Sequence, residues 1–162
     1  MIDRSMKKSI TSVALLLLVM LDVGAVTRNP RRDILGFRLG MTEEAAHRRL
    51  RKIGHQQKEE RDREREGEQE VWLLRNRRLA YVVLRFNREH ELWHITVVAH
   101  QGSHILYSEV GDIKEANQAT DGRNYTYTWK VNERSGQRGY VVVARGSDPS
   151  YLTSYSISRP FQ

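Results

Sequence analysis

The sequence predicts an α+β fold in which two short helices pack on an antiparallel sheet of about six strands. Apolar residues recur at helical spacing after Thr42, and a second helix-start pattern begins at Asp112. Each start is followed by three runs rich in β-branched and aromatic residues, separated by short polar turns. Because such turns join antiparallel neighbours, we expect the strands to pair as hairpins.

The first helix should begin at Thr42, whose hydroxyl can accept a hydrogen bond from a free amide of the first turn. Ala46, Leu50 and Ile53 lie at i, i+4 and i+7, so they should form one buried stripe. Gly54 stands where a left-handed residue ends many helices. The strands predicted after this helix cover residues 70–75, 78–86 and 92–100.

The second half follows the same plan. Residues 112–115 have the residue types of a capping box, which predicts the second helix. The strands predicted after it cover residues 124–132, 139–146 and 151–158. Gly, Glu and Ala match in register between residues 40–46 and 111–117, which indicates a degenerate tandem repeat with halves at about 40–104 and 111–160. Chance similarity between two helix starts would give the same match, so both explanations stay open.

Residues 6–25 have the features of an export signal. Two lysines precede an uninterrupted apolar core at 13–21, and small residues at 23–25 suit cleavage at about Ala25. A retained membrane anchor is the alternative, but the apolar core is much shorter than the roughly 20 residues that span a bilayer. Met1 and Met6 are both candidate starts. The predicted organisation is a signal peptide at 1–25, a flexible arm at 26–33 and a single α+β domain at 34–160.

Composition narrows the classes of protein further. The chain of 162 residues contains no cysteine, so it can form neither a disulfide, nor a thiolate metal site, nor the lipid anchor of a lipoprotein. Its net charge is +7, but arginines alternate with glutamates, most densely at 58–66, as in a solvated segment rather than a nucleic-acid-binding stripe. We therefore expect a periplasmic or secreted protein that binds no nucleic acid, touches membrane only through an uncleaved leader, and has an oligomeric state left open.

Residues 35–45, Leu-Gly-Phe-Arg-Leu-Gly-Met-Thr-Glu-Glu-Ala, followed by a basic helix ending in Gly54, resemble the G-x-x-x-G-M-[ST]-x-E-E opening of a superfamily of small exported bacterial proteins. That superfamily includes the SmpA/OmlA outer-membrane assembly proteins and the β-lactamase-inhibitor-like proteins. The resemblance implies a helical segment on an antiparallel sheet, single or in tandem, and a tendency to bind proteins. Members usually carry a lipidated cysteine or disulfides, neither of which this chain can form, and no partner-contacting residue transfers.

No catalytic, cofactor or metal site is expected. The chain has six histidines, but His90 and His94 straddle a turn into a strand, and His100 and His104 follow without a carboxylate pattern that completes a zinc site. The segment 146–149, Gly-Ser-Asp-Pro, has the composition of a tight turn rather than of a nucleophile elbow. We therefore predict a protein that is not an enzyme and needs no cofactor.

Aromatic residues suggest where a partner would bind. Two short helices cannot cover both faces of a six-stranded sheet, and Tyr and Trp on an open face would anchor a protein interface, although packing beneath the helices is the alternative for most of them. The candidate interaction face consists of Trp72, Trp93, Tyr125, Tyr127, Trp129, Tyr140, Tyr151 and Tyr155. We expect a non-catalytic exported protein-binding module whose partner is another envelope protein. The alternatives are an envelope-assembly or stress protein that binds outer-membrane or anionic cell-wall components and, last, a hydrolase.

Overall fold

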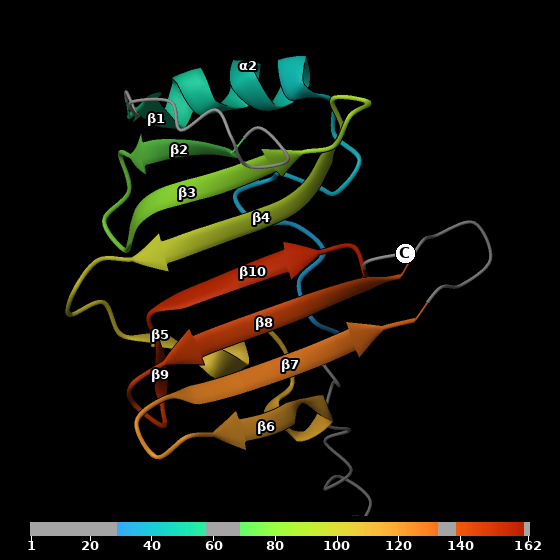
Figure 1. Cartoon of the computed structure of the whole chain (residues 1–162). Coiled ribbons are helices and arrows are strands. Elements are labelled where there is room, and N and C mark those ends of the chain that lie inside the picture. Colours follow the sequence, from blue (N-terminus) through green and yellow to red (C-terminus); the bar gives the residue numbers. More distant parts are fainter. Residues whose placement is uncertain (1–28, 58–68, 133–138, 161–162) are drawn as a thin grey trace, which may run out of the picture.

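A computed structural model describes residues 29–57, 69–132 and 139–160, and an antiparallel sheet forms its centre (Figure 1). The helix and strands are, in chain order, α2 (Glu43–Ile53), β1 (Gly54–Gln56), β2 (Gln69–Leu74), β3 (Leu79–Phe86), β4 (Leu92–Ala99), β5 (Ile105–Leu106), β6 (Asn117–Thr120), β7 (Tyr125–Val131), β8 (Tyr140–Gly146), β9 (Tyr151–Leu152) and β10 (Ser154–Ser158). The predicted α+β class is confirmed. Within the described ranges, however, there is one α-helix rather than two, and the main sheet has eight strands rather than six.

The eight strands lie in the order β1-β2-β3-β4-β10-β8-β7-β6, and every neighbouring pair is antiparallel. β4 and β10 meet at the centre, where Ile95 is paired with Ile157 and Val97 with Tyr155. From the centre outward, the first half of the chain contributes β4, β3, β2 and β1, and the second half contributes β10, β8, β7 and β6. A duplicated unit would produce this symmetry, so the strand order supports the tandem-repeat hypothesis, which stays a prediction.

The strands that the sequence did not predict are mostly the sheet edges and a small second sheet. β1 has three residues and β6 has four, all of them exposed in β6, so neither shows an apolar alternation that periodicity could detect. The predicted strand at 151–158 is divided, because β9 pairs with β5 in a separate two-stranded sheet while β10 enters the main sheet. The remaining predicted strands agree with β2, β3, β4, β7 and β8 to within one or two residues at each end.

Helix α2 begins as predicted but ends differently. The Thr42 side chain accepts a hydrogen bond from the Ala45 amide at 3.4 Å, and Leu50 is fully buried, as the apolar stripe requires. Gly54, however, is extended (φ −163°, ψ −168°), so the left-handed cap predicted there is wrong. A Cβ atom at this position would overlap the Leu73 carbonyl oxygen. Glycine therefore allows β1 to approach β2 closely.

The second predicted helix is wrong. Asp112 does accept a hydrogen bond from the Lys114 amide at 3.0 Å, but the turn it caps is a single 3₁₀ turn, Ile113–Glu115. Ile113 is 41% exposed, so the turn has no apolar face that packing could bury. A helix nucleus without such burial is not stabilised enough to propagate, and Ala116 already has extended dihedral angles that lead into β6.

One face of the sheet carries the core. Helix α2 covers it over the first half. Two segments without an α-helix run behind the sheet in Figure 1: residues 29–42 pass from the second half to the start of α2, and residues 105–116 lie behind the second half. The two segments are joined where the Arg31 amide donates to the Val110 carbonyl at 2.9 Å. The indole of Trp129 on the sheet donates to the Asp112 carbonyl at 2.7 Å. The second half of the sheet is therefore covered without an α-helix.

Residues 29–33, the part of the predicted flexible arm that the structure describes, pack against this core. Pro30 is buried, and its carbonyl accepts a hydrogen bond from the Tyr140 hydroxyl at 3.2 Å. The folded unit therefore extends before residue 34. The predicted signal peptide at 1–25 lies outside the described residues. Within the ranges 29–57, 69–132 and 139–160, no helix has the length and apolarity needed to cross a membrane.

Candidate functional sites

The opposite face of the main sheet, which we term the open face, carries no helix and no strand of the described residues; it faces the viewer in Figure 1. Strand register assigns to it the residues that alternate with the core positions. On the inner strands these are Gln69, Val71, Leu73, Tyr81, Val83, Arg85, His94, Thr96, Val98, Ser154, Ser156, Ser158, Val141, Val143, Arg145, Thr126, Thr128 and Lys130.

The predicted aromatic interaction face does not assemble on this side. Register places six of the eight aromatic residues on the covered face, and four of the six are buried. The buried four are Trp72, Tyr127, Trp129 and Tyr155, and the half-buried ones are Tyr125 and Tyr140. These rings pack closely: the centroid of the Tyr127 ring lies 4.3 Å from the centroid of the Tyr107 ring. These aromatic side chains therefore form the core, not a docking surface.

The last two aromatic candidates lie outside that set. Trp93 is half-buried beside an irregularity in the β3–β4 pairing, with its ring 5.5 Å from the His94 ring. Tyr151, in β9, packs edge-on against His104 at 4.7 Å. The eight aromatic residues consequently do not share one surface.

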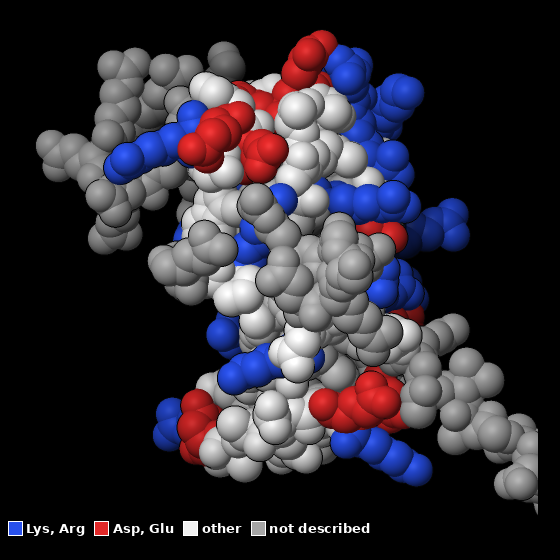
Figure 2. Space-filling model, turned by 90° about the vertical axis from the view of Figure 1, so that its right-hand side faces the viewer, with Lys and Arg blue, Asp and Glu red and all other residues white. Residues whose placement is uncertain are grey.

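The chemistry of the open face differs from that of the adjoining side of the molecule in Figure 2, where acidic and basic side chains both lie at the surface. Its strand positions are mainly Val, Thr and Ser, and its exposed charged side chains are Arg85, Lys130 and Arg145. None of the open-face strand positions is a carboxylate. Aromatic residues alternate with Thr and Lys along β7, so the sequence does contain a signal that separates these two sets of side chains.

The pKa of His94 is affected by the positive charges of the open face. Burial, together with the nearby positive charges of Arg85 and Arg145, lowers the pKa of His94 from 6.5 to about 4. The ring also makes a hydrogen bond of 2.7 Å between its Nε2 atom and the Thr96 hydroxyl. At neutral pH this imidazole is therefore uncharged, and the arginines supply the positive potential around it.

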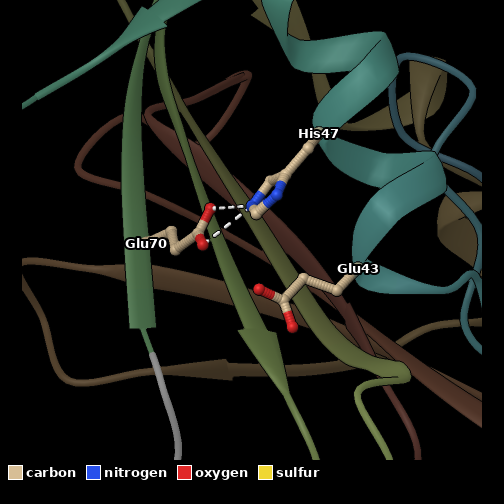
Figure 3. Close-up of side chains that lie close together, drawn as sticks. All are labelled: Glu43, His47 and Glu70. Carbon is tan, nitrogen blue, oxygen red and sulfur yellow. Dashed lines mark hydrogen bonds and ion pairs between the residues drawn. The ribbon is translucent and has the colours of Figure 1, made fainter.

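A second cluster lies on the other side of the sheet, where α2 meets β2 (Figure 3). Glu43 and His47 are one helical turn apart, so their side chains leave the same face of α2 and point toward Glu70 on β2. The His47 Nε2 atom lies 2.8 Å from both carboxylate oxygens of Glu70. One ligand atom from each of the three residues lies within 4.8 Å of the others.

Neighbouring side chains hold this cluster in position. The Trp72 indole donates to Glu70 Oε2 at 2.9 Å, and His90 Nδ1 lies 2.6 Å from Glu43 Oε2. The His47 ring packs near Trp72, at 6.0 Å between centroids. The side chains of Glu43, His47 and Glu70 retain 24%, 26% and 13% exposure, so solvent reaches a partly shielded site.

This cluster is not predicted from the sequence, because the metal hypothesis there rested on His90, His94, His100 and His104. His100 lies 3.0 Å from the Asn76 carbonyl and His104 packs on Tyr151, so neither joins it. The spacing of Glu43 and His47, four residues apart on a predicted helix, was the available signal. Glu70 is 23 residues beyond His47, and only the folded sheet brings it to the helix.

Three other carboxylates of the described residues have structural partners. Glu109 forms an ion pair of 2.7 Å with Arg78, whose hydrogen bond lowers the pKa of the Glu109 carboxyl. Asp112 caps the following 3₁₀ turn, and Asp148 accepts the Ser150 amide at 2.7 Å in the turn predicted there. These contacts account for the positions of the three side chains without a catalytic role.

Fold and sites together define an α+β protein with an eight-stranded antiparallel sheet, covered on one face by a helix and irregular segments. Comparison with protein-family models, with curated proteins and with solved structures found no match to the chain. The resemblance to the SmpA/OmlA and β-lactamase-inhibitor-like proteins therefore stays a prediction.

Proposed function

We propose that this protein is a non-catalytic, exported protein-binding module whose open face binds an acidic surface of another protein. The observation that carries the proposal is a broad sheet face of Val, Thr and Ser whose exposed charged side chains are all positive. An acidic partner would pair with Arg85, Lys130 and Arg145 around an apolar and hydroxyl-rich centre.

The size of the open face supports a protein partner. The six inner strands of the sheet, spaced about 4.8 Å apart and averaging about seven residues, cover roughly 29 Å by 23 Å, or about 700 Å². One partner in a standard-size interface buries about 800 Å². Self-association through this face is disfavoured, because two copies would bring the same three cations together.

Export is part of the proposal and rests on the leader at 1–25. The alternative function is that of an envelope-assembly protein that binds an anionic outer-membrane or cell-wall component. The three cations of the open face could pair with such a component as well. The apolar residues between those cations, Val83, Val98 and Val143 among them, favour a protein surface over a hydrated polymer.

Site-specific cross-linking tests the proposal, because a chain without cysteine can be labelled at one introduced thiol. A benzophenone attached at Thr128→Cys would probe the open face, and one at Lys52→Cys, on the exposed side of α2, is the matched control. We expect cross-links to a distinct protein from the cell envelope at position 128 and not at 52, and a loss of them with added salt or with Arg145→Glu.

Other outcomes would contradict this assignment. Equal cross-linking from both positions, or no cross-link from position 128, would show that the open face is not the docking surface. Cross-links to lipid or polysaccharide would favour the envelope-component alternative, and cross-linked dimers of the chain would favour self-association.

A further inference from the structure

We propose that Glu43, His47 and Glu70 form a binding site for a divalent transition-metal cation of the Zn²⁺ class. An imidazole nitrogen and two carboxylate oxygens are ligands that such cations accept, and three protein ligands leave coordination positions for water. The site lies on the covered side of the sheet, so it is independent of the function proposed for the open face.

The distances fit a cation after small side-chain rotations. Ligand bonds of about 2.0–2.2 Å around a four-coordinate ion separate neighbouring ligand atoms by roughly 3.3–3.6 Å. The distance from His47 Nε2 to the Glu70 carboxylate, 2.8 Å, is shorter than this range. The three ligand atoms all lie within 4.8 Å of one another, a limit that is longer than this range. Figure 3 shows the three side chains converging on one point between α2 and β2.

The charge of the cluster also favours a cation. Among the residues that the structure describes, neither Glu43 nor Glu70 forms an ion pair with lysine or arginine; their partners are His90 and His47. Two carboxylates therefore lie at one partly shielded site, and neither is paired with a lysine or an arginine of the described residues. A divalent cation would balance both.

Second contacts already orient the ligands. Trp72 donates to Glu70 Oε2 and His90 lies against Glu43 Oε2, so each carboxylate has a partner that fixes its direction. Outer partners of this kind are usual around bound metals, where they orient the ligating groups. The bound cation would connect α2 to β2 and would stabilise the folded chain by mass action.

Calorimetric and thermal titrations of the chelator-treated full-length chain with ZnCl₂ at pH 7.5 test the site, with MgCl₂ in parallel. We expect one equivalent of Zn²⁺ to bind and to raise the Tm by about 5 °C or more at 100-fold excess over Kd. Glu70→Gln and His47→Gln should each weaken Zn²⁺ binding at least tenfold. His100→Gln, which removes an imidazole outside the cluster, is the matched control and should bind as the wild type does.

A second measurement uses the wild-type chain alone, so that its result does not depend on whether the variants fold. Substoichiometric Co²⁺ should broaden or shift the imidazole NMR signals of His47 before those of His104, which lies outside the cluster. The proposal is overturned if Zn²⁺ neither binds nor shifts the Tm, if Glu70→Gln and His47→Gln leave binding unchanged, or if Co²⁺ affects both histidines equally.

Discussion

Replacement of His94 by glutamine should reduce the sensitivity of the fold to acid. The pKa of His94 is lowered from 6.5 to about 4 by burial and by Arg85 and Arg145. In the unfolded chain His94 becomes protonated as the pH falls below 6.5, whereas in the folded chain it stays neutral until about pH 4. The stability linked to His94 is therefore complete above pH 6.5 and is lost as the pH falls toward 4.

The size of the effect follows from that pKa difference. At about 1.4 kcal/mol per pH unit, the difference between 6.5 and about 4 amounts to roughly 3 kcal/mol at most. Because the ring is only partly buried, solvent screening reduces the expected loss to about 1–2 kcal/mol. Glutamine is similar in size, can still form a hydrogen bond with Thr96, and does not titrate.

Urea unfolding at pH 7.5, 6.5, 5.5 and 4.5 measures the difference. Between the extremes, the wild type should lose about 1–2 kcal/mol more unfolding free energy than His94→Gln. Arg145→Gln should move the pKa of His94 upward in an NMR titration, while Lys130→Gln, on the same face but not among the charges acting on His94, should not. Parallel stability profiles for wild type and His94→Gln, or a His94 titration near 6.5, would refute the reasoning.

Two further predictions concern packing. Gly54→Ala should lower the unfolding free energy by about 1–3 kcal/mol, because its new methyl group would overlap the Leu73 carbonyl; urea unfolding measures the loss, and unchanged stability would contradict the close approach of β1 to β2. Trp129→Phe should cost about 1–2 kcal/mol, since the partly buried Asp112 carbonyl loses its indole donor. A variant that unfolds at the same urea concentration would show that water or another donor replaces the indole.

Local interactions explain which elements could be predicted from the sequence. The cap at Thr42 and the buried stripe of Ala46 and Leu50 depend on residues within two helical turns. The alternation in β7 separates Tyr127 and Trp129 from the Thr and Lys residues between them. These features depend on neighbours in the chain, so the pattern of residue types is enough to find them.

The features that the sequence did not predict depend on contacts between segments that are distant in the chain. Alternation separates a strand into two sets of side chains but does not state which set is covered. Here the cover comes from α2 and from residues 29–42 and 105–116. Gly54 is needed for a contact with Leu73, 19 residues later, and His47 meets Glu70 only across two elements. No local pattern contains these pairs.

The central place of β10 has a consequence for how the chain folds. Residues 154–158 join β4 to β8, so until this strand is present β1–β4 and β6–β8 have no shared neighbour in the main sheet. A chain that emerges from the ribosome with its N-terminus first would therefore leave β4 unpaired along one edge until the last strand arrives. Completion of the sheet comes late and closes long loops, which makes slow folding and a need for protection from aggregation the expected behaviour of the growing chain.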